Sequence, residues 1–198
     1  MKQAVLGHLS SDRTLRSVLG SIGFELLATA RPVVQLFSSY RETSTLLHSE
    51  PVVLYIPRSF NHPAVDAVIR LVVRTAPPTS SKAVGSSSGR SAGTALPADV
   101  PLPPVTDVIV IPIHITMTPI TAEKRRRALR FFNRHHKWTA DHPTVEATYE
   151  MVFIDGADET VREERKEEQY GAVGFGEWRL RLDDVSEALA STVRRRCK

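Results

Sequence analysis

Residues 105–117, VTDVIVIPIHITM, constrain the possible folds most, because this segment is apolar on both of its faces. Successive side chains of an extended segment point to opposite faces, so the uninterrupted apolar run at 108–111 places apolar groups on both. Such a run is typical of a strand in the middle of a sheet. The segment therefore predicts a central strand.

Three further segments have the composition or the alternation of strands, and two have the apolar spacing of helices. The predicted strands are VVLYI at 52–56, TVEATYEMVFID at 144–155 and GEWRLRL at 176–182. The predicted helices cover 62–76 and 121–137. Because helices alternate with strands and the elements are few, the order favours a small α/β or α+β sandwich, with one sheet and helices on one of its faces.

Two of these expectations depend on particular residues. Asn61 is expected to cap the helix over 62–76, because its side-chain oxygen can accept from the free amides of the first turn, and Pro63 fits that turn. In 144–155, Glu150 and other polar residues alternate with apolar ones. That strand is therefore expected to expose one face to solvent.

The two ends of the chain are expected to form helical extensions. Ser10 or Ser11 can cap an N-terminal helix, and Asp184 can cap a last helix over Val185–Arg194. The chain then divides into an N-terminal extension, an α/β domain and a C-terminal helix, over 1–50, 51–183 and 184–198. The first part, with its serines and cations, also resembles a mitochondrial presequence, and this interpretation stays open beside that of a plain amphipathic helix.

Three segments between the elements are interpreted from composition. Residues 77–104 consist mostly of Gly, Ser and Pro and could bury little, so we expect a disordered loop inside the domain. The highly charged segment within 156–175 fits either a solvent-exposed helix or the tip of a hairpin, and the pattern does not decide between them. GAVGFG at 171–176 precedes a strand instead of linking a strand to a helix, which favours a turn over a nucleotide-binding loop.

The sequence contains none of the common catalytic or cofactor motifs. Cys197 is the single cysteine, which excludes a disulfide within the chain and a cysteine-based zinc site. His135, His136 and His142 are close in sequence, but neighbouring side chains on a helix point about 100° apart and no further ligands complete a tetrahedral set. No apolar run reaches membrane-spanning length. We therefore expect no enzyme activity, cofactor, metal or membrane partner.

The helix expected over 121–137 contains most of the segment KRRRALRFFNRHHKW, which is rich in cations. Arginine suits phosphates because its guanidinium is a planar fork, and histidine and tryptophan can stack on bases. The net charge of +4 is modest, so the prediction of polyanion binding rests on this clustering. The expected contacts are Lys124, Arg125, Arg126, Arg127, Arg130, Arg134, His135, His136, Lys137 and Trp138, with Arg58 and His62 at the corner after the strand 52–56.

Two alternatives to nucleic acid stay open for this helix. The acidic residues among 155–168 could pair with its cations within the chain. The helix could also dock an acidic surface of a partner protein, which would make the chain an interaction scaffold.

Several short motifs, in the expected order over 51–182, resemble the ribosomal protein S10 family. The strand-to-helix motif of the family is matched by Phe60, Asn61, His62, Val65 and Asp66. Its P-L-P segment and the following histidine are matched by Pro101, Leu102, Pro103 and His114, and its Y-E-[MI] by Tyr149, Glu150 and Met151. GFGEWRLRL stands for its last strand, whereas Val152 and Phe153 replace the usual Arg-Thr.

The resemblance implies a ferredoxin-like (split βαβ) fold with one four-stranded sheet and two helices. It also implies a non-enzymatic ribonucleoprotein component that binds rRNA beside other proteins of the small ribosomal subunit. Enlargement by insertions would suit a mitochondrial ribosome, and hence the mitochondrial matrix, with the cytoplasm as the alternative. Alba-type nucleic-acid-binding domains and the C-terminal domain of bacterial initiation factor three share the same element order, with 156–175 as a hairpin tip. The resemblance to the S10 family and the two alternatives, the Alba-type and the initiation-factor domain, all predict binding to RNA or another nucleic acid.

Overall fold

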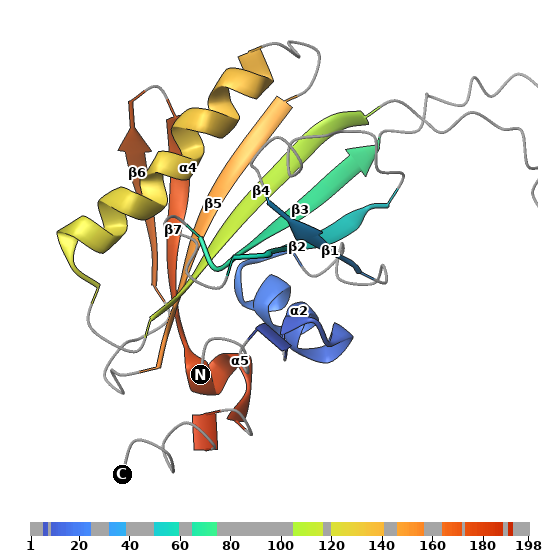
Figure 1. Cartoon of the computed structure of the whole chain (residues 1–198), viewed down its shortest axis with the longest axis vertical. Helices are drawn as coiled ribbons and strands as arrows, with labels where there is room; N and C mark the ends of the chain where they lie inside the picture. Colours follow the sequence, from blue (N-terminus) through green and yellow to red (C-terminus); the bar gives the residue numbers. More distant parts are fainter. Residues whose placement is uncertain are drawn as a thin grey trace, which may run out of the picture.

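Seven strands form one mixed sheet with helices on both faces (Figure 1). The computed structural model describes residues 6–7, 9–24, 32–38, 50–59, 65–74, 105–116, 120–140, 146–156, 164–171, 173–187 and 190–191. The expected loop over 77–104 lies outside these ranges, as do Asn61, His62 and Pro63.

The sheet combines an antiparallel half with a parallel half. Its strands are β1 (Val33–Phe37), β2 (Val52–Pro57), β3 (Ala67–Arg74), β4 (Val105–Thr116), β5 (Glu146–Asp155), β6 (Glu164–Tyr170) and β7 (Val173–Arg181). Their order in space is β1-β2-β3-β4-β5-β7-β6. β2, β3 and β4 pair antiparallel, whereas β4, β5 and β7 run parallel to one another. At the edges, β1 pairs parallel with β2 and β6 pairs antiparallel with β7.

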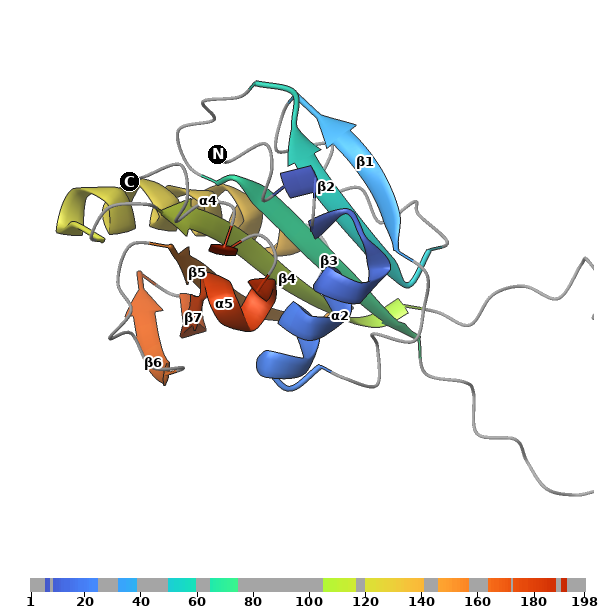
Figure 2. The same cartoon turned by 90° about the horizontal axis from the view of Figure 1, so that it is seen from below.

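The two faces of the sheet are covered by different helices. α4 (Ala122–Ala140) connects β4 to β5 and packs on one face. α2 (Asp12–Ser21) and α5 (Leu182–Val185) pack on the opposite face, as Figure 2 shows. Because side chains alternate along a strand, β3, β4 and β5 each contribute to both buried clusters.

The central strand and the N-terminal helix are confirmed. β4 pairs with β3 on one side and with β5 on the other. In α2, the side chain of Ser11 accepts a hydrogen bond from the backbone N–H of Thr14, so the predicted cap is present. Leu15, Val18 and Leu19 of this helix are buried in the same cluster as the sheet. The described part of 1–50, which was expected as an extension, therefore contributes α2 to the core and β1 to the sheet.

The predicted four-stranded, ferredoxin-like fold with helices on one face is wrong. The sheet has seven strands, and helices cover both faces. Two of the additional strands, β1 and β6, lie at the edges, and the third is β3, which was expected to be a helix. The fold implied by the S10 resemblance is therefore not the fold of this chain.

The helix predicted over 62–76 is wrong where the structure describes it, because residues 67–74 form β3. β3 lies between β2 and β4 and is buried on both faces, so apolar residues follow one another along it without alternating with polar ones. Such a run contains the three- and four-residue spacing of a helix by coincidence. Ile69 and Leu71 pack in the cluster under α2, whereas Val68 packs in the cluster under α4. Val72 is buried and, by alternation, lies on the same face as Val68.

Arg70 is the one cation within the apolar run of β3. Its side chain is 1% exposed, and its guanidinium carbon lies 5.3 Å from the centroid of the Tyr55 ring on β2. Burial lowers the pKa of Arg70 below its usual value, and the neighbouring Tyr55 acts against this effect. Arg70 is therefore a structural residue of the sheet.

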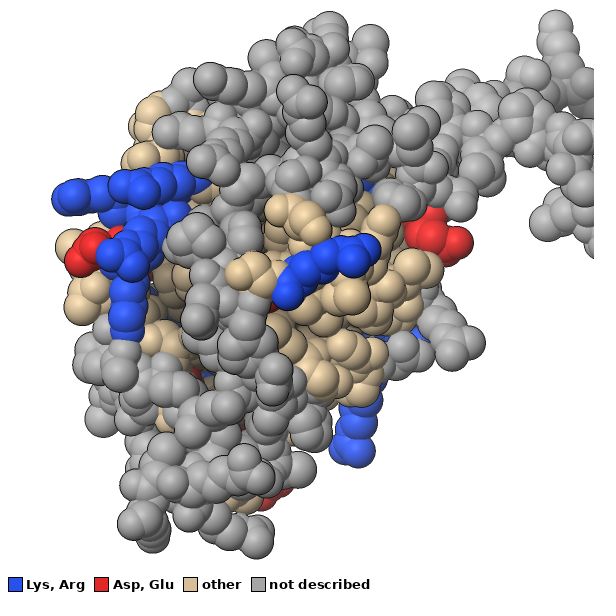
Figure 3. Space-filling view, viewed as in Figure 1, with Lys and Arg blue, Asp and Glu red and all other residues tan. Residues whose placement is uncertain are grey.

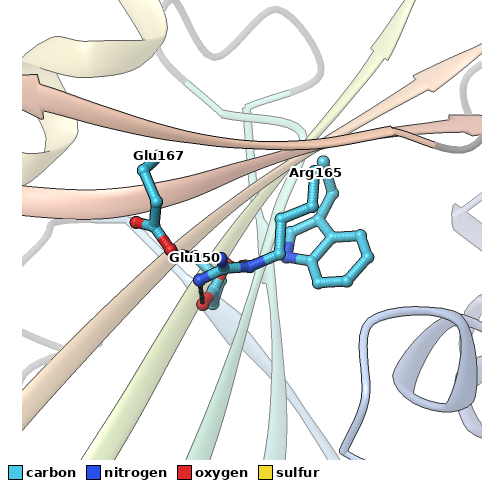
Figure 4. Close-up of polar contacts among 4 residues, drawn as sticks. Glu150, Arg165 and Glu167 are labelled. Atoms are coloured by element: carbon cyan, nitrogen blue, oxygen red, sulfur yellow. Dashed lines mark hydrogen bonds and ion pairs between the residues drawn. The ribbon is translucent and has the colours of Figure 1, made fainter.

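β5 is a strand as predicted, but the polar face that its alternation predicted is not exposed over the whole length of the strand. Glu150 is 6% exposed, and its carboxylate accepts hydrogen bonds from Nε1 of Trp178 at 2.7 Å and Nη2 of Arg165 at 3.1 Å. Figure 4 shows Arg165 between the carboxylates of Glu150 and Glu167. These contacts raise the pKa of Arg165 above its usual value. They join β6 to the β5–β7 pair on the face of α2.

Of the two alternatives for 156–175, a helix or a hairpin tip, the hairpin is confirmed where the structure describes this segment. β6 begins at Glu164 and returns as β7 through a turn in which Gly171 has φ 63°. β7 begins at Val173, so part of the predicted glycine-rich turn lies in a strand. The last helix, predicted over Val185–Arg194 with Asp184 as its cap, is not present in that form. α5 (Leu182–Val185) includes Asp184 and ends at Val185, and the later residues that the structure describes, 187 and 190–191, are again helical.

Replacing Gly176 by alanine is expected to destabilise the protein by roughly 2–3 kcal/mol, the cost of forcing atoms into a packed site. Gly176 is paired with Glu150 across the strands, and an added Cβ would lie 2.0 Å from Oε2 of Glu150. The free energy of unfolding in urea, followed by circular dichroism, measures this cost. Gly174→Ala is the matched control, because a Cβ at this exposed position meets nothing within 4 Å. Equal stability of the two variants would contradict the assigned packing of Glu150.

Candidate nucleic-acid interface

α4 is held on the sheet by its apolar face. Ala128, Leu129, Phe131 and Phe132 are buried. The ring centroid of Phe132 lies 4.8 Å from that of Phe175 on β7 and 5.4 Å from that of Tyr149 on β5. These contacts fix the rotation of the helix about its own axis, because the same residues cannot be buried in any other orientation. The predicted helix and its apolar stripe are confirmed.

The first turn of α4 is fixed by polar contacts. The side-chain oxygen of Thr121 accepts from the backbone N–H of Lys124 at 3.3 Å, which makes Thr121 the cap. Nζ of Lys124 lies 3.4 Å from Oγ1 of Thr116 at the end of β4. Lys124 is half-buried and contacts the sheet, so it is not part of the solvent-facing side of the helix.

Arg125 links α4 to the β6–β7 hairpin. Its Nε donates to Glu177 at 2.6 Å, and its Nη2 lies 3.0 Å from Oε1 of Glu168. Glu177 is 3% exposed, so this ion pair neutralises a buried carboxylate. Burial lowers the pKa of Arg125, but the hydrogen bonds and charges of Glu177 and Glu168 outweigh it, and the pKa lies above its usual value. The expected intramolecular pairing of acidic residues with the helix thus exists at Arg125.

The remaining described arginines of α4 face solvent. Arg127 pairs with Glu123 one turn earlier, and both side chains are exposed. Arg126 and Arg130 are exposed, and within the described part of the chain they form no ion pair. Figure 3 shows blue side chains gathered over the region of α4, with few red ones among them. We call Arg126, Arg127 and Arg130 the arginine face.

The other predicted contacts are only partly described. Arg58 is exposed directly after β2, and its backbone N–H donates to the carbonyl of Phe37 on β1. β2 is separated from β5 by β3 and β4, so Arg58 belongs to a different part of the sheet from α4. α4 extends to Ala140, but the side chains of five predicted residues within it are not described. They are Arg134, His135, His136, Lys137 and Trp138.

Asp66 and His114, two of the residues that match the S10 motifs, lie close together in the fold. The carboxylate of Asp66, before β3, accepts from the backbone N–H of Ile115 on β4 at 2.8 Å. Oδ2 of Asp66 also lies 3.6 Å from Nδ1 of His114, whose ring stacks on Phe153 at 5.7 Å. Asp66 is 5% exposed, so these contacts tie the start of β3 to the end of β4. No pattern in the sequence marks this pairing, because the two residues are 48 positions apart.

The described residues show neither a metal-binding cluster nor a membrane-spanning helix. They contain no group of three or more His, Cys, Asp or Glu residues that could hold a metal ion. Among their helices, none is long and apolar enough to cross a membrane.

Comparisons with known proteins give no relative. No family model, no curated protein and no solved structure matches this chain.

Replacing Arg125 by glutamine is expected to lower the free energy of unfolding by roughly 2–3 kcal/mol, because it leaves the buried Glu177 without its closest cation. Arg127→Gln removes the same charge from a solvent-exposed pair and is expected to cost less than about 1 kcal/mol. Urea denaturation of both variants separates the two roles. A similar loss for both would show that the tie between α4 and the hairpin does not stabilise the fold.

Proposed function

We propose that this chain binds RNA along its sugar–phosphate backbone through the arginine face of α4. The observation that carries this proposal is the division of the arginines within one helix. Arg125 is engaged by the protein's own glutamates, whereas Arg126 and Arg130 project into solvent one turn apart. A ligand that supplies regularly spaced negative charges fits this arrangement.

The arginine face is unfavourable for the isolated helix. Residues four apart on a helix are neighbours, so the cations of Arg126 and Arg130 repel each other. Glu123 is exposed and already paired with Arg127, which leaves part of this repulsion uncompensated. Phosphates would relieve it, and release of the counterions condensed on the nucleic acid would add to the affinity.

The buried side of α4 makes the proposed interface rigid. The aromatic contacts of Phe132 and the ion pairs of Arg125 hold the helix before any ligand arrives. The arginines therefore lose only side-chain freedom on binding, which lowers the entropic cost of association. A preformed helical face of this kind suits a binding component of a ribonucleoprotein, and the proposal includes no catalytic step.

The proposal rests on α4 and not on the resemblance to the S10 family. The fold that the resemblance implied is wrong, and the matched Asp66 and His114 contact each other inside the protein. A role in the small ribosomal subunit and a mitochondrial location stay predictions.

Substituting Arg126 and Arg130 together by glutamine is expected to weaken binding to single-stranded RNA on the order of tenfold at 0.1 M salt. It should also reduce the slope of log K against log salt by about 1.4, because each lost contact to a single strand contributes about 0.7. Fluorescence anisotropy with a labelled homopolymer RNA, repeated over a series of salt concentrations, measures both quantities.

The matched control for this experiment is Arg13→Gln with Arg16→Gln, which removes the same charge from exposed positions of α2 on the opposite face. Its salt slope should equal that of the wild type. If the variant with Arg126→Gln and Arg130→Gln has the same salt slope as the control variant, the arginine face is excluded as the RNA-binding site. Absence of any RNA binding by the wild type, together with binding to an acidic protein surface, would favour the interaction scaffold instead.

A further inference from the structure

One edge of the sheet exposes apolar side chains. β1 is the outermost strand, and Figure 2 shows no helix or strand drawn beyond it. Val33, Val34 and Leu36 of this strand are 40%, 44% and 51% exposed. These three are the only large apolar residues of the described chain that are classed as exposed, and all of them lie within five residues. Such an edge is a template for pairing with another strand.

The opposite edge of the same sheet is protected. β6, ERKEEQY, has five charged residues among seven, and their charges discourage pairing with a further strand. β1, VVQLF, has no charged residue. Of the two edge strands, only β1 lacks charged residues, so the edge formed by β1 is the one that can accommodate a partner strand.

We infer that β1 pairs with β1 of a second copy of this chain, antiparallel and about a two-fold axis at Gln35. An uncharged strand meets no like charge when it pairs with itself, and closed two-fold pairs are the commonest form of self-association. The outer backbone groups of β1 supply the hydrogen bonds, since its inner ones pair with β2.

The side chains of β1 are self-complementary in this register. Antiparallel pairing about Gln35 places Val34 opposite Leu36 twice, on the face of α2. Side chains directly opposite in such a pair approach to about 5 Å between Cβ atoms, close enough to bury the exposed apolar groups against each other. On the other face the two Gln35 side chains meet at the axis. Val33 comes opposite Phe37, which is already buried within its own copy and adds no side-chain contact.

The geometry of this pairing sets the positions of the two RNA-binding faces. Directly opposed residues of antiparallel strands lie on the same face of a sheet, so the two-fold axis is perpendicular to it. The two sheets then continue into each other, and both copies of α4 lie on one side. If the arginine face binds RNA, the dimer presents two such faces to one strand, although the dimer itself does not depend on that function.

Sedimentation velocity between 1 and 200 µM tests the inference on the full chain. Five residues of strand edge form an interface smaller than the standard of about 1,600 Å², so we expect a dissociation constant in the micromolar range. Val34→Lys with Leu36→Lys should give a monomer throughout, and circular dichroism should show the fold unchanged because both side chains are exposed. Gln169→Lys with Glu187→Gln adds the same charge at other exposed positions and should dimerise like the wild type.

A cysteine at the axis tests the register independently. In a Cys197→Ser background, Gln35→Cys places two thiols opposite each other, at a Cβ separation close to that of a disulfide. Mild oxidation should give a covalent dimer, and Gln169→Cys in the same background should give little. Addition of Val34→Lys and Leu36→Lys should abolish the cross-link at position 35.

Three results would overturn the inference. The first is a wild-type protein that stays monomeric up to 200 µM. In that case a strand of an unrelated protein would be the remaining candidate for pairing with β1. The second is a dimer that persists with lysines at 34 and 36. The third is cross-linking at 169 as efficient as at 35. None of these measurements uses RNA, so they succeed or fail independently of the proposed function.

Discussion

The packing of Phe132 against β5 and β7 is the contact on which the arrangement of α4 depends. Its ring lies 4.8 Å from Phe175 and 5.4 Å from Tyr149, so the helix joins the two parallel strands. Once this side of the helix is buried, the period of 3.6 residues decides which cations face the protein and which face solvent. Arg125 then points to Glu177, and Arg126 and Arg130 point away from the sheet. The proposed function follows from this division and not from the net charge.

Two buried carboxylates support the same half of the sheet from opposite faces. Glu177 accepts from Arg125 of α4, and Glu150 accepts from Arg165 of β6 and from Trp178. Both glutamates would be costly to bury alone. Each glutamate therefore requires its arginine. The ion pairs of Arg165 with Glu150 and of Arg125 with Glu168 together hold the charged edge strand β6 in place. The described arginines of α4 and β6 thus divide into those that pair with buried carboxylates and those that face solvent, and only the latter enter the proposed function.

The sequence predicts the elements whose apolar pattern is unambiguous. α2, β2, β4 and α4 were predicted because they have either a clear helical stripe or a short apolar run. β3 was mistaken for a helix because a strand buried on both faces contains apolar residues at every spacing. β1 was missed because Gln35 interrupts the apolar run of VVQLF, which therefore lacks the uninterrupted run by which β2 was predicted. The ion pairs of Arg125 and the burial of Glu150 could not be predicted, since they depend on partners 15 to 52 residues away. The exposure of Arg126 and Arg130 follows directly from the helical period.

Photo-cross-linking is the most direct test of the proposed RNA-binding surface. The full chain is bound to 4-thiouridine-containing RNA, irradiated and digested, and the cross-linked peptides are identified by mass spectrometry. The account predicts cross-links concentrated in peptides of α4 that contain Arg126 and Arg130. Cross-links confined to β6, β7 or α2, with the peptides of α4 unmodified, would contradict it.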